Sequence, residues 1–384
     1  MKKGCDWVLT AAVGSRAGCA SLLMQPQSGF RLVTTSPSPS SMLLRSTQAF
    51  PQKRELHVDL HGGRSSVSGV VASVFGATGF VGRYVVNRLG KIGSQVVIPY
   101  RGEEKAYRHL KTMGDLGQIV PIWYAIRDYE SVKRAMQHSN VVINLVGRNY
   151  ETRNFTLEDV HVHGAATIAR AAKEVGIERL IHVSAANASE TSSSHWLRTK
   201  AAGEKAVKQI FPEATILRPT PMFGLHDWFV MRYTRLAKYW PFYPLILPDH
   251  KVQPLWAGDM GTALMNALAS NDTKGKTYEL GGPTIYTNAE LADLILDTTL
   301  LKKPVVHVPY APFAALTSIT DKVFRLPKFT YKELEAMRAG DQVVDRKAHP
   351  LGIEELGVEH RAEILDITRN ALRDYRQPGH LGEF

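Results

Sequence analysis

The feature that most constrains the fold is a β-branched run that leads through three regularly spaced glycines into an amphipathic segment. Residues 70–75 are typical of a buried strand, and residues 83–89 have the apolar spacing of a helix. Between them, Gly76, Gly79 and Gly82 recur every three residues. A glycine turn between a strand and a helix is typical of a site for a dinucleotide pyrophosphate, because N–H groups at the helix N-terminus face the phosphates.

Each glycine of this turn has its own expected role. Gly76 permits the tight turn, Gly79 lets the backbone approach the pyrophosphate, and Gly82 lets the helix pack close to the strand. The predicted phosphate cradle is the whole turn: Gly76, Ala77, Thr78, Gly79, Phe80, Val81 and Gly82.

Strands and helices alternate through the following residues. Further strands are predicted at 95–100, 119–124, 140–146, 179–184 and 214–218, and helices at 129–138, 157–175 and 194–210. This pattern predicts an α/β fold, a doubly wound parallel sheet of the Rossmann type with ligands beyond the carboxyl ends of the strands. We expect this domain to span residues 62–225, with its sheet completed by parts of 252–285, and a smaller, mostly helical domain to span 226–384.

The residue after the second strand bears on which dinucleotide would bind. Arg101 stands where an NAD site would need an acid to accept hydrogen bonds from the adenosine ribose. A guanidinium suits the 2′-phosphate instead, so we predict NADPH as cofactor, with NADP+ or NADH as weaker alternatives. Two other readings stay open: Glu103 or Glu104 could supply the acid from a shifted loop, and Arg101 could be a solvated surface residue.

The N-terminal segment has the composition of a targeting sequence. Residues 1–54 are rich in Ser and hold seven basic residues and one acid, Asp6. The resulting net charge of this segment is more than half of the +11 of the whole chain. Such a leader is typical of a mitochondrial or plastid transit peptide, cleaved here between Arg31 and His61. The alternative is a disordered tail without an address. Because the excess charge lies in this segment, we expect no nucleic-acid partner.

Several short runs after the glycine turn carry a family resemblance. They are NLVG at 144–147, IHVSA at 181–185, Arg218-Pro219, QPLWAGDM at 253–260 and YELGGP at 278–283. Over roughly residues 68–300 the chain resembles the extended and atypical branches of the short-chain dehydrogenase/reductase superfamily. Besides the cradle, the resemblance implies cofactor contacts from Arg101, Ile126, Leu145, Val146, Gly147, Ser184, Lys200, Pro219 and Phe223.

One position departs from the catalytic pattern of that superfamily. Active members carry Tyr-x-x-x-Lys on a helix, where the tyrosine hydroxyl exchanges the proton. Here the segment runs from Trp196 to Lys200, and an indole has no titratable oxygen. Ala185 stands where an assisting serine is common, with Ser184 one residue early. We therefore predict no catalytic residues, although His195 remains a candidate substitute acid.

Longer runs narrow the resemblance. They are GGRSSVSGVVASVFGATGFVGRYVVNRLGKIGSQVVIPYRG at 62–102, HLKTMGDLGQIVP at 109–121, NVVINLVGRNYETRNFTLEDV at 140–160 and FPEATILRP at 211–219. With these the chain resembles the NADPH-binding 39 kDa accessory subunits of mitochondrial respiratory complex I (NADH:ubiquinone oxidoreductase). The resemblance implies a non-catalytic subunit that holds NADPH as a structural cofactor. It further implies contacts with other complex I subunits, support of matrix-arm assembly, and a place on the matrix side of the inner membrane.

Other interpretations stay open. The chain could be an active NADPH-dependent reductase or epimerase that uses His195, Ser184 or a bound water as proton donor, or a redox-sensing module. The basic and aromatic segment 229–248 suits a membrane interface or a partner subunit, or equally a lid packed inside the protein. His161 and His163 lack the acids or cysteines that would complete a metal shell, so we predict no metal site.

Overall fold

The computed structural model describes Val58, Leu60 and residues 62–323 and 330–376. These residues belong to one compact unit, Glu55–Phe384. The predicted leader lies outside the described residues. Within the described part, none of the helices combines the length and apolarity that crossing a bilayer requires.

The unit is built on a seven-stranded sheet whose neighbouring strands are all parallel. Its strands are β1 (Val71–Phe75), β2 (Gln95–Tyr100), β3 (Ile119–Trp123), β4 (Val141–Asn144), β5 (Arg179–Val183), β6 (Thr215–Pro219) and β11 (Thr277–Leu280). They lie in the order β11-β6-β5-β4-β1-β2-β3. This order confirms the predicted doubly wound sheet, and its direction of winding reverses between β1 and β4, where such folds bind ligands.

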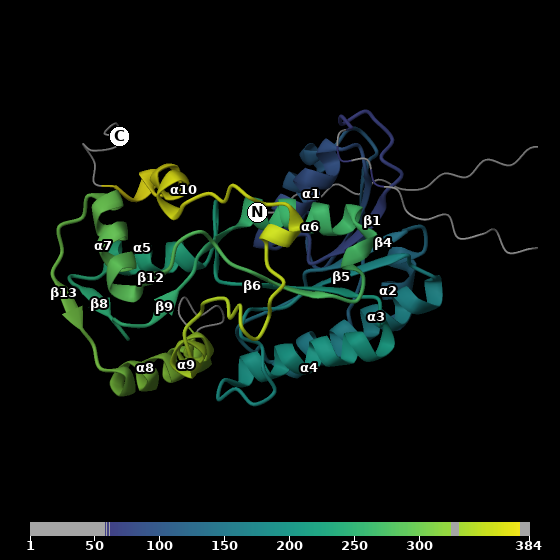
Figure 1. The fold of residues 1–384 in the computed structure, drawn as a ribbon. Coiled ribbons are helices and arrows are strands. Elements are labelled where there is room, and N and C mark those ends of the chain that lie inside the picture. The colour runs from purple at the N-terminus through teal and green to yellow at the C-terminus, as the bar shows by residue number, and fades with distance from the viewer. Residues whose placement is uncertain (1–57, 59, 61, 324–329, 377–384) are drawn as a thin grey trace, which may run out of the picture. The chain divides into compact units, whose positions relative to one another are not determined.

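Helices cover both faces of the sheet (Figure 1). On one face α1 (Phe80–Lys91) packs beside α6 (Ala257–Ala269). On the other, α2 (Tyr129–Met136), α3 (Gly164–Val175) and α4 (His195–Ile210) pack in succession. The predicted helix 157–175 begins differently: Asp159–His163 forms a π-helical turn, and the α-helix starts at Gly164.

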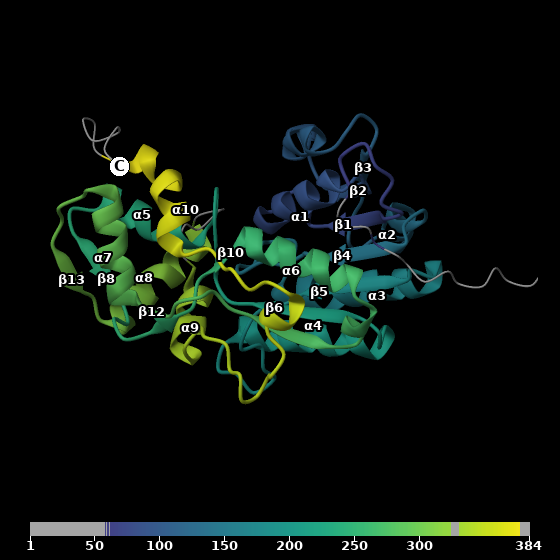
Figure 2. The same ribbon diagram turned by 45° about the horizontal axis from the view of Figure 1, so that its top comes forward.

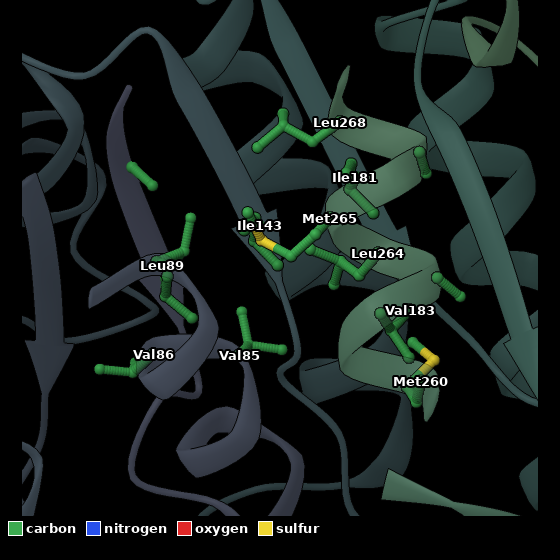
Figure 3. Close-up of a cluster of buried hydrophobic side chains, with 14 of the residues drawn as sticks. Val85, Val86, Leu89, Ile143, Ile181, Val183, Met260, Leu264, Met265 and Leu268 are labelled. Carbon is green, nitrogen blue, oxygen red and sulfur yellow. The ribbon is translucent and has the colours of Figure 1, made fainter. Parts of the chain in front are cut away.

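Apolar side chains from both layers form the core beneath α1 and α6. Figure 3 shows Val85 and Leu89 of α1 on the side of Ile143, Ile181 and Val183 of the sheet, with Met260, Leu264, Met265 and Leu268 of α6 beside them. Val86 of α1 belongs to the same cluster. These side chains are almost wholly removed from water. Burying apolar surface of this extent is the main free-energy gain that fixes α1, and with it the glycine turn, against the sheet.

A second group of elements follows β6 and lies at the left of Figures 1 and 2. Its helices are α5 (Phe229–Tyr239), α7 (Asn288–Thr299), α8 (Tyr310–Val323), α9 (Tyr331–Ala339) and α10 (Ile364–Ala371). Its short strands are β7 (Met222–Phe223), β8 (Tyr243–Leu245), β9 (Lys251–Val252), β10 (Leu255–Trp256), β12 (Tyr286–Thr287) and β13 (Val305–His307). Helices thus dominate this region, as predicted, although the stretch between α9 and α10 is mostly irregular.

Candidate nucleotide-binding site

A cavity of about 990 Å³ opens at the carboxyl edge of the sheet. The glycine turn, the ends of β4, β5 and β6, and the first turns of α4 line one side. Residues of α5, α9 and the segment 340–345 line the other. The cavity therefore lies between the sheet and the elements that follow it, where a doubly wound fold places its ligand.

The structure brings together most of the residues predicted to contact a cofactor. Those that line the cavity are Gly76, Gly79, Phe80, Val81, Gly82, Leu145, Gly147, Ser184, Lys200 and Pro219. Ala77, Ile126 and Phe223 are instead buried in hydrophobic clusters. Thr78 and Val146 are half-buried next to lining residues, and Arg101 is exposed at the end of β2.

The glycine turn has a backbone that other residues would strain. Gly76 has φ of +82°, and a Cβ there would lie 2.9 Å from the carbonyl carbon of Leu145. A Cβ on Gly82 would lie 2.3 Å from the carbonyl oxygen of Ala77, so this glycine allows the close contact between helix and turn. These contacts agree with a tight turn at Gly76 and a close approach of α1 at Gly82, and Gly79 and Phe80 at the N-terminus of α1 line the cavity.

Arg101 stacks near an aromatic side chain from a distant loop. Its guanidinium carbon lies 5.5 Å from the ring centroid of Phe155. Arg127 lies 4.4 Å from the same ring and forms an ion pair of 3.0 Å with Asp159. The Phe155 ring thus lies beside both guanidiniums, which are both exposed, and Arg101 is the one at the end of β2, the strand next to β1.

Trp196 is anchored through the peptide groups of the loop after β4. Its indole N–H donates to the carbonyl oxygen of Arg148 over 2.8 Å. The N–H of Arg148 donates to Nε2 of His161 over 3.1 Å, and Nδ1 of His161 lies 2.9 Å from the Thr199 hydroxyl. Because that hydroxyl donates to the carbonyl of Trp196, the histidine carries its proton on Nδ1. Both polar groups of the Arg148 backbone are therefore hydrogen-bonded, which fixes the loop after β4 at the base of the cavity.

Lys200 presents its ammonium to this floor. A Cβ built on Gly147 would lie 2.9 Å from Nζ of Lys200, which places the end of the lysine side chain directly against this glycine. Burial lowers the pKa of Lys200 to about 8, partly offset by the charge of Glu204 one helical turn later. The Glu204 carboxylate already accepts hydrogen bonds from Nε and Nη2 of Arg218, the latter over 2.8 Å.

The candidates for a substitute proton donor lie in different surroundings. Ser184 lines the cavity, and its buried hydroxyl has no hydrogen-bond partner among the described residues. His195 is not among the lining residues, and its Nε2 lies 3.9 Å from a carboxylate oxygen of Glu151.

Helix α9 closes the cavity from the side opposite the glycine turn. Glu333 forms an ion pair of 2.9 Å with the buried Arg232 of α5 and accepts a hydrogen bond from Asn149. Glu335 accepts the N–H of His195 at the start of α4, so α9 is joined to both sides of the site. Sequence reasoning missed this role. The box Thr330-x-x-Glu333 indicates where a helix starts, but not what that helix covers.

Two other predicted features lie apart from the cavity centre. Within 229–248, most of α5 is buried, whereas Tyr239 and Trp240 at its end are 70% and 37% exposed. The internal packing of α5 agrees with the lid alternative, and the exposed aromatic residues at its end stay a candidate for lipid contact.

His161 is buried and His163 exposed, so these two imidazoles do not face one point.

These observations together fit a dinucleotide. Gly76, Gly79 and Gly82 of the glycine turn line the cavity without side chains, Ser184 offers an unpartnered hydroxyl, and Lys200 brings a cation to the cavity floor. Anionic phosphates at the helix N-terminus and ribose hydroxyls near the lysine would complete these groups.

Known proteins that resemble this chain agree with the interpretation of the cavity as a nucleotide-binding site. A family model described as NAD(P)H-binding matches residues 76–224. The chain is 43% identical over 343 residues to NADH dehydrogenase [ubiquinone] 1 alpha subcomplex subunit 9, mitochondrial, of Mus musculus, covering 86% of this chain and 89% of that protein. The chain belongs to this subunit 9 family.

Further relatives of subunit 9 come from distant organisms. The Dictyostelium discoideum subunit 9 is 48% identical over 239 residues, covering 62% of this chain and 67% of that protein. The NADH-ubiquinone oxidoreductase 40 kDa subunit of Neurospora crassa is 40% identical over 319 residues and 82% of each chain.

Among solved structures, the fold resembles NADPH-dependent quinone oxidoreductase complexed with NADPH from Escherichia coli, with a TM-score of 0.61 and 17% identity. That match covers 79% of this chain and 99% of the other. This chain thus shares the fold of that oxidoreductase.

Proposed function

We propose that this protein is a non-catalytic accessory subunit of mitochondrial respiratory complex I that holds NADPH as a structural cofactor. Its membership of the subunit 9 family, whose members are named for that enzyme, supports the assignment. In this role it binds other complex I subunits and supports assembly of the matrix arm, on the matrix side of the inner membrane. The basic, acid-poor leader agrees with a mitochondrial address.

The proposal that the protein is not a catalyst depends mainly on the position and the hydrogen bond of Trp196. The indole lines the cavity at the helix position from which the superfamily's tyrosine acts. Its N–H, the only polar hydrogen of the side chain, is already donated to the carbonyl of Arg148. Proton transfer to a carbonyl substrate therefore has no donor at this position, while the cradle and Lys200 remain able to hold a nucleotide.

The choice of NADPH rests on Arg101. When bound, the cofactor could supply a hydride, but the residues here would only retain it. The turn at 76–82 would receive the pyrophosphate, Arg101 the 2′-phosphate, and Lys200 the ribose near Trp196. Phe80 and Pro219, which line the cavity, would exclude water from the nicotinamide side.

The direct test follows the protein in its native membranes. Mitochondrial membranes solubilised in mild detergent are separated on a native gel, and the chain is expected to migrate with the NADH-oxidising complex. Nucleotide extracted from the purified complex should include NADPH in proportion to this subunit, and a Gly76→Val variant should lose it. Migration of the chain apart from that complex would refute the subunit assignment.

A second candidate is an active NADPH-dependent reductase or epimerase, which the unpartnered hydroxyl of Ser184 favours. In this interpretation, Ser184 or a bound water replaces the tyrosine beside Lys200. The purified protein is mixed with NADPH and a panel of carbonyl substrates, and oxidation is followed by absorbance. NADPH oxidation above that of a protein-free control would establish this function, and its loss in a Ser184→Ala variant would identify Ser184 as the donor. A rate equal to the protein-free control supports the structural role.

A further inference from the structure

We propose that Arg127 is a second specificity residue for the 2′-phosphate of NADPH, and that Phe155 positions it beside Arg101. This role rests on the proposed retention of NADPH and deepens it. The general pattern of a doubly wound dinucleotide site includes the turn after β1 and the residue after β2. It assigns no role to Arg127, which follows β3, or to Phe155, in the loop after β4.

The two arginines come from the same edge of the sheet as the glycine turn. Arg101 directly follows β2, and Arg127 follows β3 by four residues. The two strands are parallel neighbours whose last residues, Tyr100 and Trp123, are paired, and β2 lies next to β1. Both guanidiniums therefore extend from the carboxyl edge, on the side where the adenosine half of a dinucleotide would lie.

One aromatic ring gathers the two cations. The guanidinium carbon of Arg101 lies 5.5 Å from the ring centroid of Phe155, and that of Arg127 lies 4.4 Å from it. The ring is half-buried and packs against a cluster of buried side chains, and the backbones of Thr152 and Phe155 are hydrogen-bonded to each other across a tight turn. Because the ring face attracts cations, the loop after β4 brings both guanidiniums to one place.

The hydrogen bonds of Arg127 orient it without using all its donors. Its Nη2 donates to the carbonyl oxygen of Asn154 over 2.6 Å and to the carboxylate of Asp159 over 3.0 Å. A guanidinium carries five N–H groups in a planar fork, so the hydrogens of Nε and Nη1 remain. Among the described residues they have no partner, and the side chain is 60% exposed. Arg101 is exposed as well, and no described residue accepts a hydrogen bond from its guanidinium.

The chemistry of this cluster fits a 2′-phosphate. Such a group carries a charge approaching −2 at neutral pH and three acceptor oxygens, so a single guanidinium neutralises it only in part. Arg101 and Arg127 together outweigh the one carboxylate of Asp159, and each still has N–H groups to donate. The ribose hydroxyl that NADH has in its place is neutral and would gain little from a second cation. The pair therefore favours NADPH over NADH.

The test measures the dissociation constants of NADPH and NADH for the purified full-length chain by equilibrium dialysis, with their ratio as the readout. Arg127→Gln is expected to weaken NADPH binding about tenfold and NADH binding less than about twofold, the result of losing one charged hydrogen bond to the phosphate. This variant also leaves Asp159 unpaired. A double variant, Arg127→Gln with Asp159→Asn, keeps the net charge of the wild type and should lose the same preference.

Phe155→Leu tests the ring and decides the question if Arg127→Gln does not fold. Leucine keeps an apolar side chain for the loop but has no face that attracts guanidiniums, so the NADPH preference should fall, whereas Phe155→Tyr should retain it. Arg134→Gln, at an exposed position on α2, is the matched control and should behave as the wild type. A purely structural role for Arg127 or Phe155 would weaken both nucleotides alike and leave the ratio unchanged.

The outcomes separate this role from the proposed function. If the wild type prefers NADPH and the folded variants of Arg127 and Phe155 keep that preference, the role is refuted and the proposed function stands. The same holds if the double variant recovers the preference, because repulsion by the unpaired Asp159 would then explain the single variant. A wild type that binds neither nucleotide, or both equally, refutes the NADPH assignment and this role together.

Discussion

At the scale of single residues, the site depends on side chains whose hydrogen bonds are used for structure. Trp196 and His161 hold the two polar groups of the Arg148 backbone, and Thr199 joins them. A tyrosine at position 196 would have to give up its hydroxyl proton to act. The indole instead locks the loop, which suits a protein that retains a cofactor rather than turning it over.

Lys200→Met is expected to weaken nucleotide retention at least tenfold and to stabilise the nucleotide-free protein at neutral pH. Lowering the pKa of Lys200 from 10.5 to about 8 means that its charge costs the fold about 3 kcal/mol. Between these two pKa values the unfolded chain binds more protons, so wild-type stability rises with pH there. Urea unfolding of both proteins between these two pH values measures the gain in stability and the pH dependence, and equilibrium dialysis measures the loss of nucleotide. A variant less stable than the wild type at neutral pH would contradict the buried-charge interpretation.

Arg101→Glu is expected to weaken retention of NADPH much more than that of NADH. A charge-assisted contact to the 2′-phosphate is worth about 1.5–3 kcal/mol, so the ratio of the two affinities should change at least tenfold. Equilibrium dialysis with each nucleotide measures the ratio. Arg134→Glu on α2 makes the same charge change away from the cavity and should leave it unaltered. Equal loss of both nucleotides in Arg101→Glu would remove the argument for NADPH.

At the scale of elements, the cavity is closed by a helix that follows the sheet in sequence by some fifty residues. Helix α9 starts at a capping box and reaches the loop after β4 through Glu333 and Asn149. It also reaches α5 through the ion pair with Arg232, one of the most buried cations of the described part. Breaking a buried pair leaves a charge that water cannot fully solvate.

Glu333→Gln is expected to speed release of NADPH more than tenfold, with a smaller loss of overall stability. The amide keeps the volume and the contact with Asn149 but removes the charge opposite Arg232, which loosens α9. Stopped-flow dilution of the NADPH-loaded protein measures the release rate. Arg338→Gln, an exposed position on the same helix, is the control and should leave the rate unchanged. Equal rates in all three proteins would show that α9 does not limit release.

At the scale of the whole molecule, the fold buries two histidines, His182 on β5 and His161 in the π-helical turn before α3. Burial lowers the pKa of His161 to about 2 and that of His182 to about 3, and the charge of Lys200 adds to both shifts. His182 lies at the end of β5, where Asn144 donates its amide hydrogen to Nδ1 over 3.1 Å. Both imidazoles stabilise the fold only while neutral.

Unfolding in acid is therefore expected to involve these two groups. Their stabilisation is complete above the unfolded-state pKa of 6.5 and is lost as pH falls from there toward the folded-state values, since the unfolded chain binds the protons first. Each group contributes a slope of about 1.4 kcal/mol per pH unit. His182→Gln should halve the part of the slope that these two groups contribute, as measured by urea unfolding at successive pH values. His138→Gln, at an exposed position, serves as the control, and a slope unchanged by His182→Gln would contradict the assignment.

Much of the fold could be predicted because its signals are local. The glycine turn, the β-branched strands and the alternation with helices each depend on residues within one element and its neighbours. The six strands predicted from the sequence are all present, with ends that differ by one or two residues. The structure buries Ile126 and Phe223 in hydrophobic clusters, surroundings that the residues next to them in the sequence did not indicate.

The sequence by itself determined the parallel sheet and the glycine turn between β1 and α1, because backbone preference and side-chain chemistry are properties of short segments. Only the tertiary structure decided that α9 covers the cavity and that Arg148 is held by Trp196 and His161. These contacts join residues far apart in the chain. Chain crossovers and core packing set their distances, and no local pattern encodes them.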